Sequence, residues 1–265
     1  MSKPELHFAH ANGIPSASYL KLFGALESVF DVKYLPVMGT DPAYPVDANW
    51  NSLIDQVADS IRQRCNGPVI GLGHSMGGLT TFMAAHRHPE LFKAIVMLDP
   101  PIIIGLGALS FGFMKAIGQV DRITPAGKSK GRREVWPSRD VARELLGKKR
   151  LFSSFDPDCF EAYLDFGLSD CEEGVRLTIP SAVEVEIFRH TPHNLWRFRS
   201  PLQVPGILLS GAQSEFRRTG FAERMSRTHS MLHEYVEGGH MFPLERPLQT
   251  AGHILDALKK EMVIA

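Results

Sequence analysis

With 265 residues, the chain is long enough to bury a sizeable core and has an ordinary length for a single α/β domain. Hydrophobic residues make up 44% of it and charged residues 22%, which is typical of a globular protein and excludes a disordered one. Lysine plus arginine and aspartate plus glutamate both number 29, so the net charge gives no reason to expect binding to nucleic acid.

No stretch has the length and apolarity of a transmembrane helix or of a signal-peptide core, so we expect no stable insertion into a membrane. The three cysteines, Cys65, Cys159 and Cys171, lack metal-ligand spacing and fit a reducing compartment, which predicts a cytoplasmic protein. His190 and His193 lie three residues apart, but a zinc site needs further ligands that the sequence does not supply. We therefore expect neither a metal nor an organic cofactor, and the sequence leaves a homo-oligomer open.

The first hundred residues alternate between short apolar runs and helix-like segments. This alternation predicts a mostly parallel sheet with crossover helices, the α/β class. The expected strands are Leu6–Ala9, Val32–Leu35, Val69–Leu72 and Ala94–Leu98, and the expected helices are 17–28, 50–64 and 78–86. After residue 200 the pattern resumes with strands at 206–210 and 231–236 and a helix at 247–260.

The segment Gly73-His74-Ser75-Met76-Gly77 has the pattern Gly-x-Ser-x-Gly and stands between an expected strand and an expected helix. This context is typical of a sharp turn that holds a serine hydroxyl clear of the sheet. Glycines on both sides allow the strand and the helix to approach closely around that turn. We predict that Ser75 is a catalytic nucleophile, which needs a base to take its proton.

Of the eleven histidines, His240 is the expected base. It follows two glycines on a loop between the last expected strand and the last expected helix, from which its ring can turn over a neighbouring strand end. A carboxylate must then fix the tautomer of the imidazole and stabilise its charged form. Asp99 and Glu215 both follow apolar runs, so both are candidates at the carboxyl ends of parallel strands.

Together these features resemble the α/β-hydrolase superfamily, as does His10-Ala11-Asn12-Gly13-Ile14-Pro15, which is similar to the family's His-Gly-x-Pro loop. The resemblance implies an oxyanion hole formed by the backbone N–H groups of Asn12 and Met76. The loop departs from the pattern, since Ala11 replaces a glycine and one extra residue precedes Pro15. The resemblance also favours Glu215 as the acid, because the family usually places it on that loop, with Asp99 as the alternative.

The alternation of strands and helices stops after Pro101, and residues 101–200 are expected to form a helical cap inserted into a core of residues 1–100 and 201–265. The apolar stretch 102–117 either lines an acyl-binding pocket or packs on the core. Basic residues between 128 and 150 are expected to form a solvated surface, with attraction of acidic substrates such as acyl-CoA as the alternative.

The expected activity is hydrolysis of a small-to-medium carboxylic ester through an acyl-serine intermediate, and the expected partner is a small-molecule ester or related acyl compound. A serine nucleophile argues against the dehalogenase and epoxide-hydrolase branches, which use aspartate at this position. The same residues could cleave thioesters, lactones or carbon–carbon bonds, because the fold does not decide the substrate. A non-catalytic, ligand-sensing scaffold is the alternative from another class.

Overall fold

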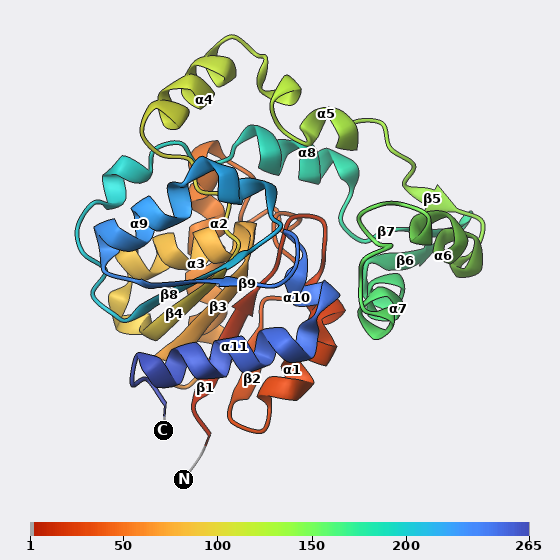
Figure 1. Ribbon diagram of the computed structural model, residues 1–265. Helices are drawn as coiled ribbons and strands as arrows, with labels where there is room; N and C mark the ends of the chain where they lie inside the picture. Colours follow the sequence, from red (N-terminus) through yellow and green to blue (C-terminus); the bar gives the residue numbers. More distant parts are fainter. Residues whose placement is uncertain (1–2, 265) are drawn as a thin grey trace.

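The computed structural model describes residues 3–264, so the outermost residues of the predicted core, 1–2 and 265, lie outside it. Its centre is a six-stranded sheet in the order β2-β1-β3-β4-β8-β9, in which every neighbouring pair is parallel (Figure 1). The strands lie within two residues of the predicted bounds: β1 (Glu5–Ala9), β2 (Asp31–Tyr34), β3 (Val69–His74), β4 (Phe92–Leu98), β8 (Gly206–Gly211) and β9 (Leu232–Val236).

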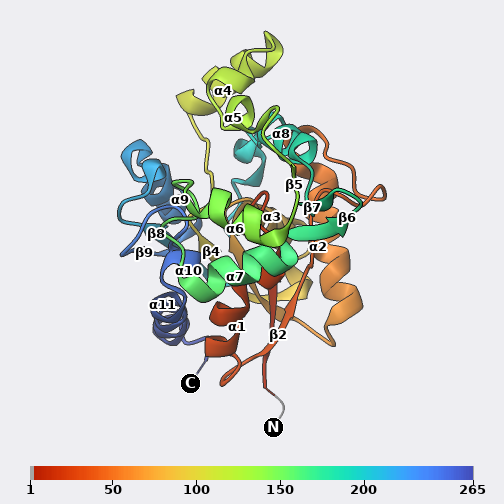
Figure 2. The same cartoon turned by 90° about the vertical axis from the view of Figure 1, so that its right-hand side faces the viewer.

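Helices cover both faces of this sheet (Figures 1 and 2). One face carries α1 (Leu20–Leu26) and α11 (Pro247–Lys260), and the other carries α2 (Asn51–Arg64), α3 (Met76–Arg87) and α9 (Phe221–His229). In β4, Val96 and Leu98 belong to the core on the α1 side, whereas Ile95 and Met97 belong to the core on the α3 side. Strands buried on both faces need apolar residues at every position, which explains the continuous apolar runs of the sequence.

Residues 101–200, which we call the insertion, connect β4 to β8. Helices are its main regular elements, as expected: α4 (Leu106–Ala116), α5 (Ala126–Ser129), α6 (Arg139–Gly147), α7 (Pro157–Phe166), α8 (Ser181–Arg189) and short 3-10 turns that include η5 (Leu195–Phe198). It also contains a small antiparallel sheet, β5-β7-β6, which the sequence pattern did not predict. Its strands are β5 (Val135–Trp136), β6 (Leu168–Cys171) and β7 (Gly174–Leu177). That the insertion forms a separate cap domain stays a prediction.

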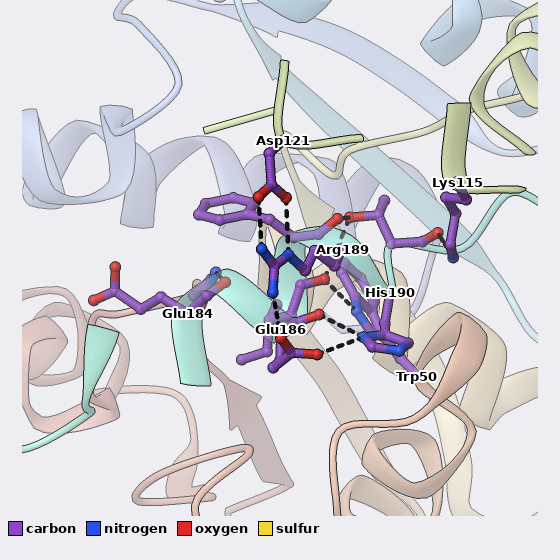
Figure 3. Close-up of polar contacts among 11 residues, drawn as sticks. Trp50, Lys115, Asp121, Glu184, Glu186, Arg189 and His190 are labelled. Atoms are coloured by element: carbon purple, nitrogen blue, oxygen red, sulfur yellow. Dashed lines mark hydrogen bonds and ion pairs between the residues drawn. The ribbon is translucent and has the colours of Figure 1, made fainter. Parts of the chain in front are cut away.

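Helix α8 is tied to both the core and the rest of the insertion (Figure 3). The indole N–H of Trp50 donates to the carbonyl of Ile187 at 2.9 Å. On the outer side, Arg189 forms ion pairs with Asp121 and Glu186 at 2.6 and 2.8 Å. Glu184, which is also on α8, points away from this cluster in Figure 3. It lies against Gly13 of the core instead. Between residues 3 and 264, no helix combines the length and the apolarity needed to cross a bilayer.

Candidate active site

Ser75 occupies the sharp turn between β3 and α3. Its backbone has φ 53° and ψ −118°, a conformation that is strained for any residue with a Cβ. The Ser75 N–H donates to the carbonyl of Leu98 at 2.8 Å, which fastens the turn to the end of the neighbouring strand β4. The turn therefore raises the serine above the carboxyl edge of the sheet, as the Gly-x-Ser-x-Gly pattern predicts.

The glycines on either side of Ser75 are required by close backbone contacts. A Cβ added at Gly77 would lie 2.1 Å from the carbonyl oxygen of Ala9, and one added at Gly73 would lie 2.3 Å from the carbonyl oxygen of Gly77. Neither contact can be relieved by a side-chain rotation, because the opposing atoms belong to the backbone. The strand β1, the turn and the start of α3 can thus pack together only with glycine at these positions.

Replacing Gly77 by alanine should therefore lower the free energy of unfolding by about 3 kcal/mol or more, because the backbone of β1 must move. Gly252→Ala is the control: this exposed glycine of α11 has no atom within 4 Å of an added Cβ, and the change should stabilise the helix by about 0.5–1 kcal/mol. Urea unfolding of both variants measures the difference. Equal stability of Gly77→Ala and the wild type would contradict this account.

The loop that carries His240 lies between β9 and α10 (Phe242–Glu245). Two side chains hold its glycines: the N–H of Gly238 donates to Gln213 Oε1 at 2.6 Å, and the N–H of Gly239 donates to Glu245 Oε2 at 2.9 Å. Sequence reasoning missed both Gln213 and Glu245, since a polar side chain that binds a distant loop leaves no local pattern.

His74 supports the same loop from below. Its Nε2–H donates to the carbonyl of His240 at 2.9 Å, and its Nδ1 accepts from the hydroxyl of Tyr19 at 2.7 Å. Burial holds the pKa of His74 well below its usual value, so the ring stays neutral. A neutral ring has one donor and one acceptor, which this pair of contacts requires.

Ser75, His240 and Asp99 form a continuous hydrogen-bonded chain. The Nδ1–H of His240 donates to Asp99 Oδ2 at 2.7 Å, which leaves Nε2 as an acceptor, 3.1 Å from Ser75 Oγ. Asp99 follows β4 directly and is only 2% exposed to solvent. Its carboxylate also accepts the N–H of Gly211 at 3.0 Å and the hydroxyl of Ser214 at 2.6 Å. These contacts fix both the carboxylate and the tautomer of the imidazole.

The expectation that Glu215 pairs with His240 is therefore wrong, and the alternative, Asp99, is the residue in contact. Glu215 is exposed at the start of the 3-10 turn η6 (Glu215–Thr219). Its neighbour Ser214 turns inward instead, capping η6 through Phe216 N–H and donating to Asp99. The loop after β8 thus supplies a hydroxyl that supports the acid, and the acid itself comes from β4.

The loop His10–Pro15 lies against the Ser75 turn. The N–H of Gly77 donates to the carbonyl of His10 at 3.1 Å, which brings the loop beside the first turn of α3. Burial lowers the pKa of His10 to about 4, so this ring is neutral; Nδ1–H donates to the carbonyl of Ala11 and Nε2 accepts the N–H of Met38. The N–H of Met76, at the first position of α3, has no acceptor within the helix. This placement is compatible with the predicted use of the N–H groups of Asn12 and Met76 as oxyanion donors.

Helix α8 of the insertion holds the same loop from above. Asn12 Nδ2 donates to the carbonyl of Glu184 at 3.0 Å, and the carboxylate of Glu184 lies so close to Gly13 that an added Cβ would be 2.6 Å from Oε1. Glu184 is buried and forms an ion pair with Arg132. Burial raises the pKa of Glu184 to about 7, although Arg132 opposes the shift. Sequence reasoning did not identify Glu184, because its partners lie far away in the chain.

The raised pKa predicts a pH dependence of stability. The folded protein retains the Glu184 proton up to a pH of about 7, whereas the unfolded chain loses it near the ordinary glutamate pKa of 4.5. The free energy of unfolding should therefore fall as the pH rises from about 4.5 to about 7, by roughly 1–3 kcal/mol relative to a Glu184→Gln variant. Urea unfolding of both proteins across this range measures the difference, and parallel stability curves would contradict the prediction.

The chain resembles known hydrolases in sequence over part of its length. It is 32% identical over 100 residues to the type I acyl-CoA thioesterase mpaH′ of Penicillium brevicompactum. The match covers 38% of this chain and 21% of that protein, so the chain spans about one fifth of the length of this curated relative.

Solved structures of hydrolases resemble the whole chain. The E-2-(acetamidomethylene)succinate hydrolase superposes with a TM-score of 0.77 at 20% identity and covers 98% of this chain and 92% of that one. The thioesterase domain from the curacin biosynthetic pathway gives 0.75 at 16% identity, over 96% and 91%. These likenesses show the fold alone. The sequence profile of the alpha/beta hydrolase family matches residues 10–253, nearly the full length. This chain is therefore a member of the alpha/beta hydrolase family.

Proposed function

We propose that this hydrolase cleaves a small-to-medium carboxylic ester through an acyl-enzyme intermediate on Ser75. One observation carries the proposal: Ser75 Oγ, the His240 ring and the Asp99 carboxylate form a hydrogen-bonded chain with links of 3.1 and 2.7 Å. A hydroxyl, a base and a buried carboxylate in this order are the components that activate a serine for attack on a carbonyl.

In the first half of the reaction, Ser75 Oγ attacks the carbonyl carbon while His240 Nε2 takes the hydroxyl proton. In this proposal, the N–H groups of Asn12 and Met76 stabilise the negative charge that develops on the carbonyl oxygen, as oxyanion donors do in such reactions. Asp99 stabilises the imidazolium that forms without taking its proton. The bond to the leaving oxygen then breaks, and His240 returns the proton to the departing alcohol.

In the second half, water replaces the alcohol. His240 Nε2 takes a proton from this water, whose oxygen attacks the acyl carbon bound to Ser75. The second tetrahedral intermediate collapses with cleavage of the bond to Ser75 Oγ, which recovers its proton from His240. The products are the carboxylic acid and the free enzyme, so each turnover consumes one water.

A thioester is the second candidate substrate class. It is supported by the similarity to a relative named as an acyl-CoA thioesterase and by the fold shared with a thioesterase domain. The chemistry is the same at Ser75, with a thiolate in place of the alkoxide as leaving group.

A panel with a common acyl group tests the proposal. p-Nitrophenyl hexanoate, hexanoyl-CoA and a six-carbon lactone should be assayed with the wild type and with Ser75→Ala. We expect steady turnover of the ester by the wild type, preceded by a burst of p-nitrophenol equimolar with the protein. Labelling of Ser75 without turnover of any compound would instead indicate a ligand-sensing scaffold, and selective turnover of hexanoyl-CoA would establish the thioesterase.

A further inference from the structure

The structure contains an open cavity of about 760 Å³ that the proposed reaction does not use. Its walls come from α3, from α4 and the residues before it, from η5 and from α9. None of Ser75, His240 and Asp99 lines it. Its volume is in the range of ordinary small-molecule sites, so it has room for a ligand of its own.

Most of the cavity wall is apolar. Phe82 of α3, Ile103, Leu195 and Met225 contribute buried or half-buried side chains. Leu106 and Leu109 of α4 also line it, although they are 84% and 71% exposed. Leucines this exposed beside a cavity indicate a surface that an apolar group would cover, because covering them removes apolar area from water.

The charged side chains of the cavity are all of one sign. Arg199 and Arg224 line it, no aspartate or glutamate does, and neither arginine belongs to any ion pair among residues 3–264. Thr228 and two histidines, His193 and His229, also line the cavity. Burial lowers the pKa of both histidines, so the positive charge comes from the arginines. The Nδ1 atoms of His193 and His229 are buried without a hydrogen-bond partner in the described residues.

We propose that this cavity is a second ligand site, distinct from the serine site, that binds an amphipathic carboxylate. The alkyl chain lies against α4, Phe82 and Met225, and the carboxylate is bound by Arg199 and Arg224. A guanidinium and a carboxylate match in both charge and geometry, and each of the two arginines has free donors for such a contact. The apolar wall supplies most of the affinity and the arginines supply the selectivity for an anion.

Dodecanoate is the probe that tests this site. It should be titrated calorimetrically, below its micelle concentration, into Ser75→Ala and into wild-type protein whose Ser75 has been blocked by a small fluorophosphonate. Saturable binding to both is expected, because the site does not include Ser75. Loss of binding in the blocked protein would place the carboxylate in the catalytic cleft and overturn the proposal, as would the absence of binding to either protein.

Two comparisons test the role of the arginines. The double variant Arg199→Gln/Arg224→Gln should bind dodecanoate about tenfold more weakly, as expected for loss of charge-assisted contacts at a partly exposed site. Arg227→Gln is the matched control, since Arg227 is exposed on the same helix α9 but does not line the cavity. Dodecanol should bind about as weakly to the wild type as dodecanoate does to the double variant. The proposal would be overturned if the wild type bound dodecanol and dodecanoate equally well. It would also be overturned if the double variant and Arg227→Gln bound dodecanoate equally well.

Discussion

Replacement of Ser75 by alanine and replacement of His240 by alanine should each lower kcat for the preferred ester by roughly 10⁶-fold. The two side chains act as one unit, since Ser75 Oγ lies 3.1 Å from the nitrogen that must take its proton. Without the base the hydroxyl stays a weak nucleophile, and without the hydroxyl the base has only water to activate. Substrate binding should change little, because neither side chain is needed to hold the ground state.

The double variant Ser75→Ala/His240→Ala tests whether the two side chains act as one unit. It should retain the same residual rate as each single variant, because that rate comes from the oxyanion donors and from binding alone. His253→Ala, on helix α11 away from the site, is the control and should keep the wild-type kcat. Multiplicative losses in the double variant would mean that the two residues act independently and that His240 is not the base for Ser75.

The second large effect is expected at Asp99, whose replacement by asparagine should lower kcat by roughly 10⁴-fold. The carboxylate accepts the Nδ1–H of His240 at 2.7 Å, together with the N–H of Gly211 and the hydroxyl of Ser214. An amide has one oxygen where the carboxylate has two, so its nitrogen must face a donor. The imidazole then adopts the other tautomer, in which Nε2 already carries a hydrogen and cannot accept the serine proton.

Glu215→Gln is the matched control, because both changes convert a carboxylate into an amide at the carboxyl end of a core strand. Glu215 is exposed and does not contact His240, so its variant should keep kcat within about twofold of the wild type, as surface changes usually do. A large loss in Glu215→Gln with little change in Asp99→Asn would show that the acid comes from the loop after β8.

Local sequence patterns were sufficient to predict the strands of the core and the position of Ser75. The apolar runs are continuous because both faces of the sheet are covered, and the glycines around Ser75 are required by backbone contacts within the turn. His240 was identifiable for a related reason, since its loop follows the last strand and contains Gly238 at φ 125°. These signals all lie within a few residues of the feature that they indicate.

The choice between Asp99 and Glu215 could not be made in this way. Both residues follow a strand, and local sequence does not show which carboxylate faces the histidine. The outcome depends on Ser214, whose hydroxyl turns toward Asp99 and leaves Glu215 on the surface. That contact joins residues more than a hundred positions apart, so it exists only once the sheet has formed.

The small sheet of the insertion was missed for another physical reason. Its strands are two to four residues long and mix buried with exposed positions, as in β6, where Leu168 is buried and Ser169 and Asp170 are exposed. Strands this short give too few alternations to distinguish from a loop. Glu184 could not be identified from local sequence either, because burial raises its pKa and it packs against Gly13, which is far away in the chain.

The central claim is that Ser75 carries the acyl group during turnover. The most direct test mixes the enzyme with p-nitrophenyl hexanoate, stops the reaction in acid within the burst, and locates the added mass by peptide mass spectrometry. The account predicts a hexanoyl group on the peptide that contains Ser75, and no such adduct in Ser75→Ala. Turnover with no acyl group on this peptide, or with the group on another residue, would contradict it.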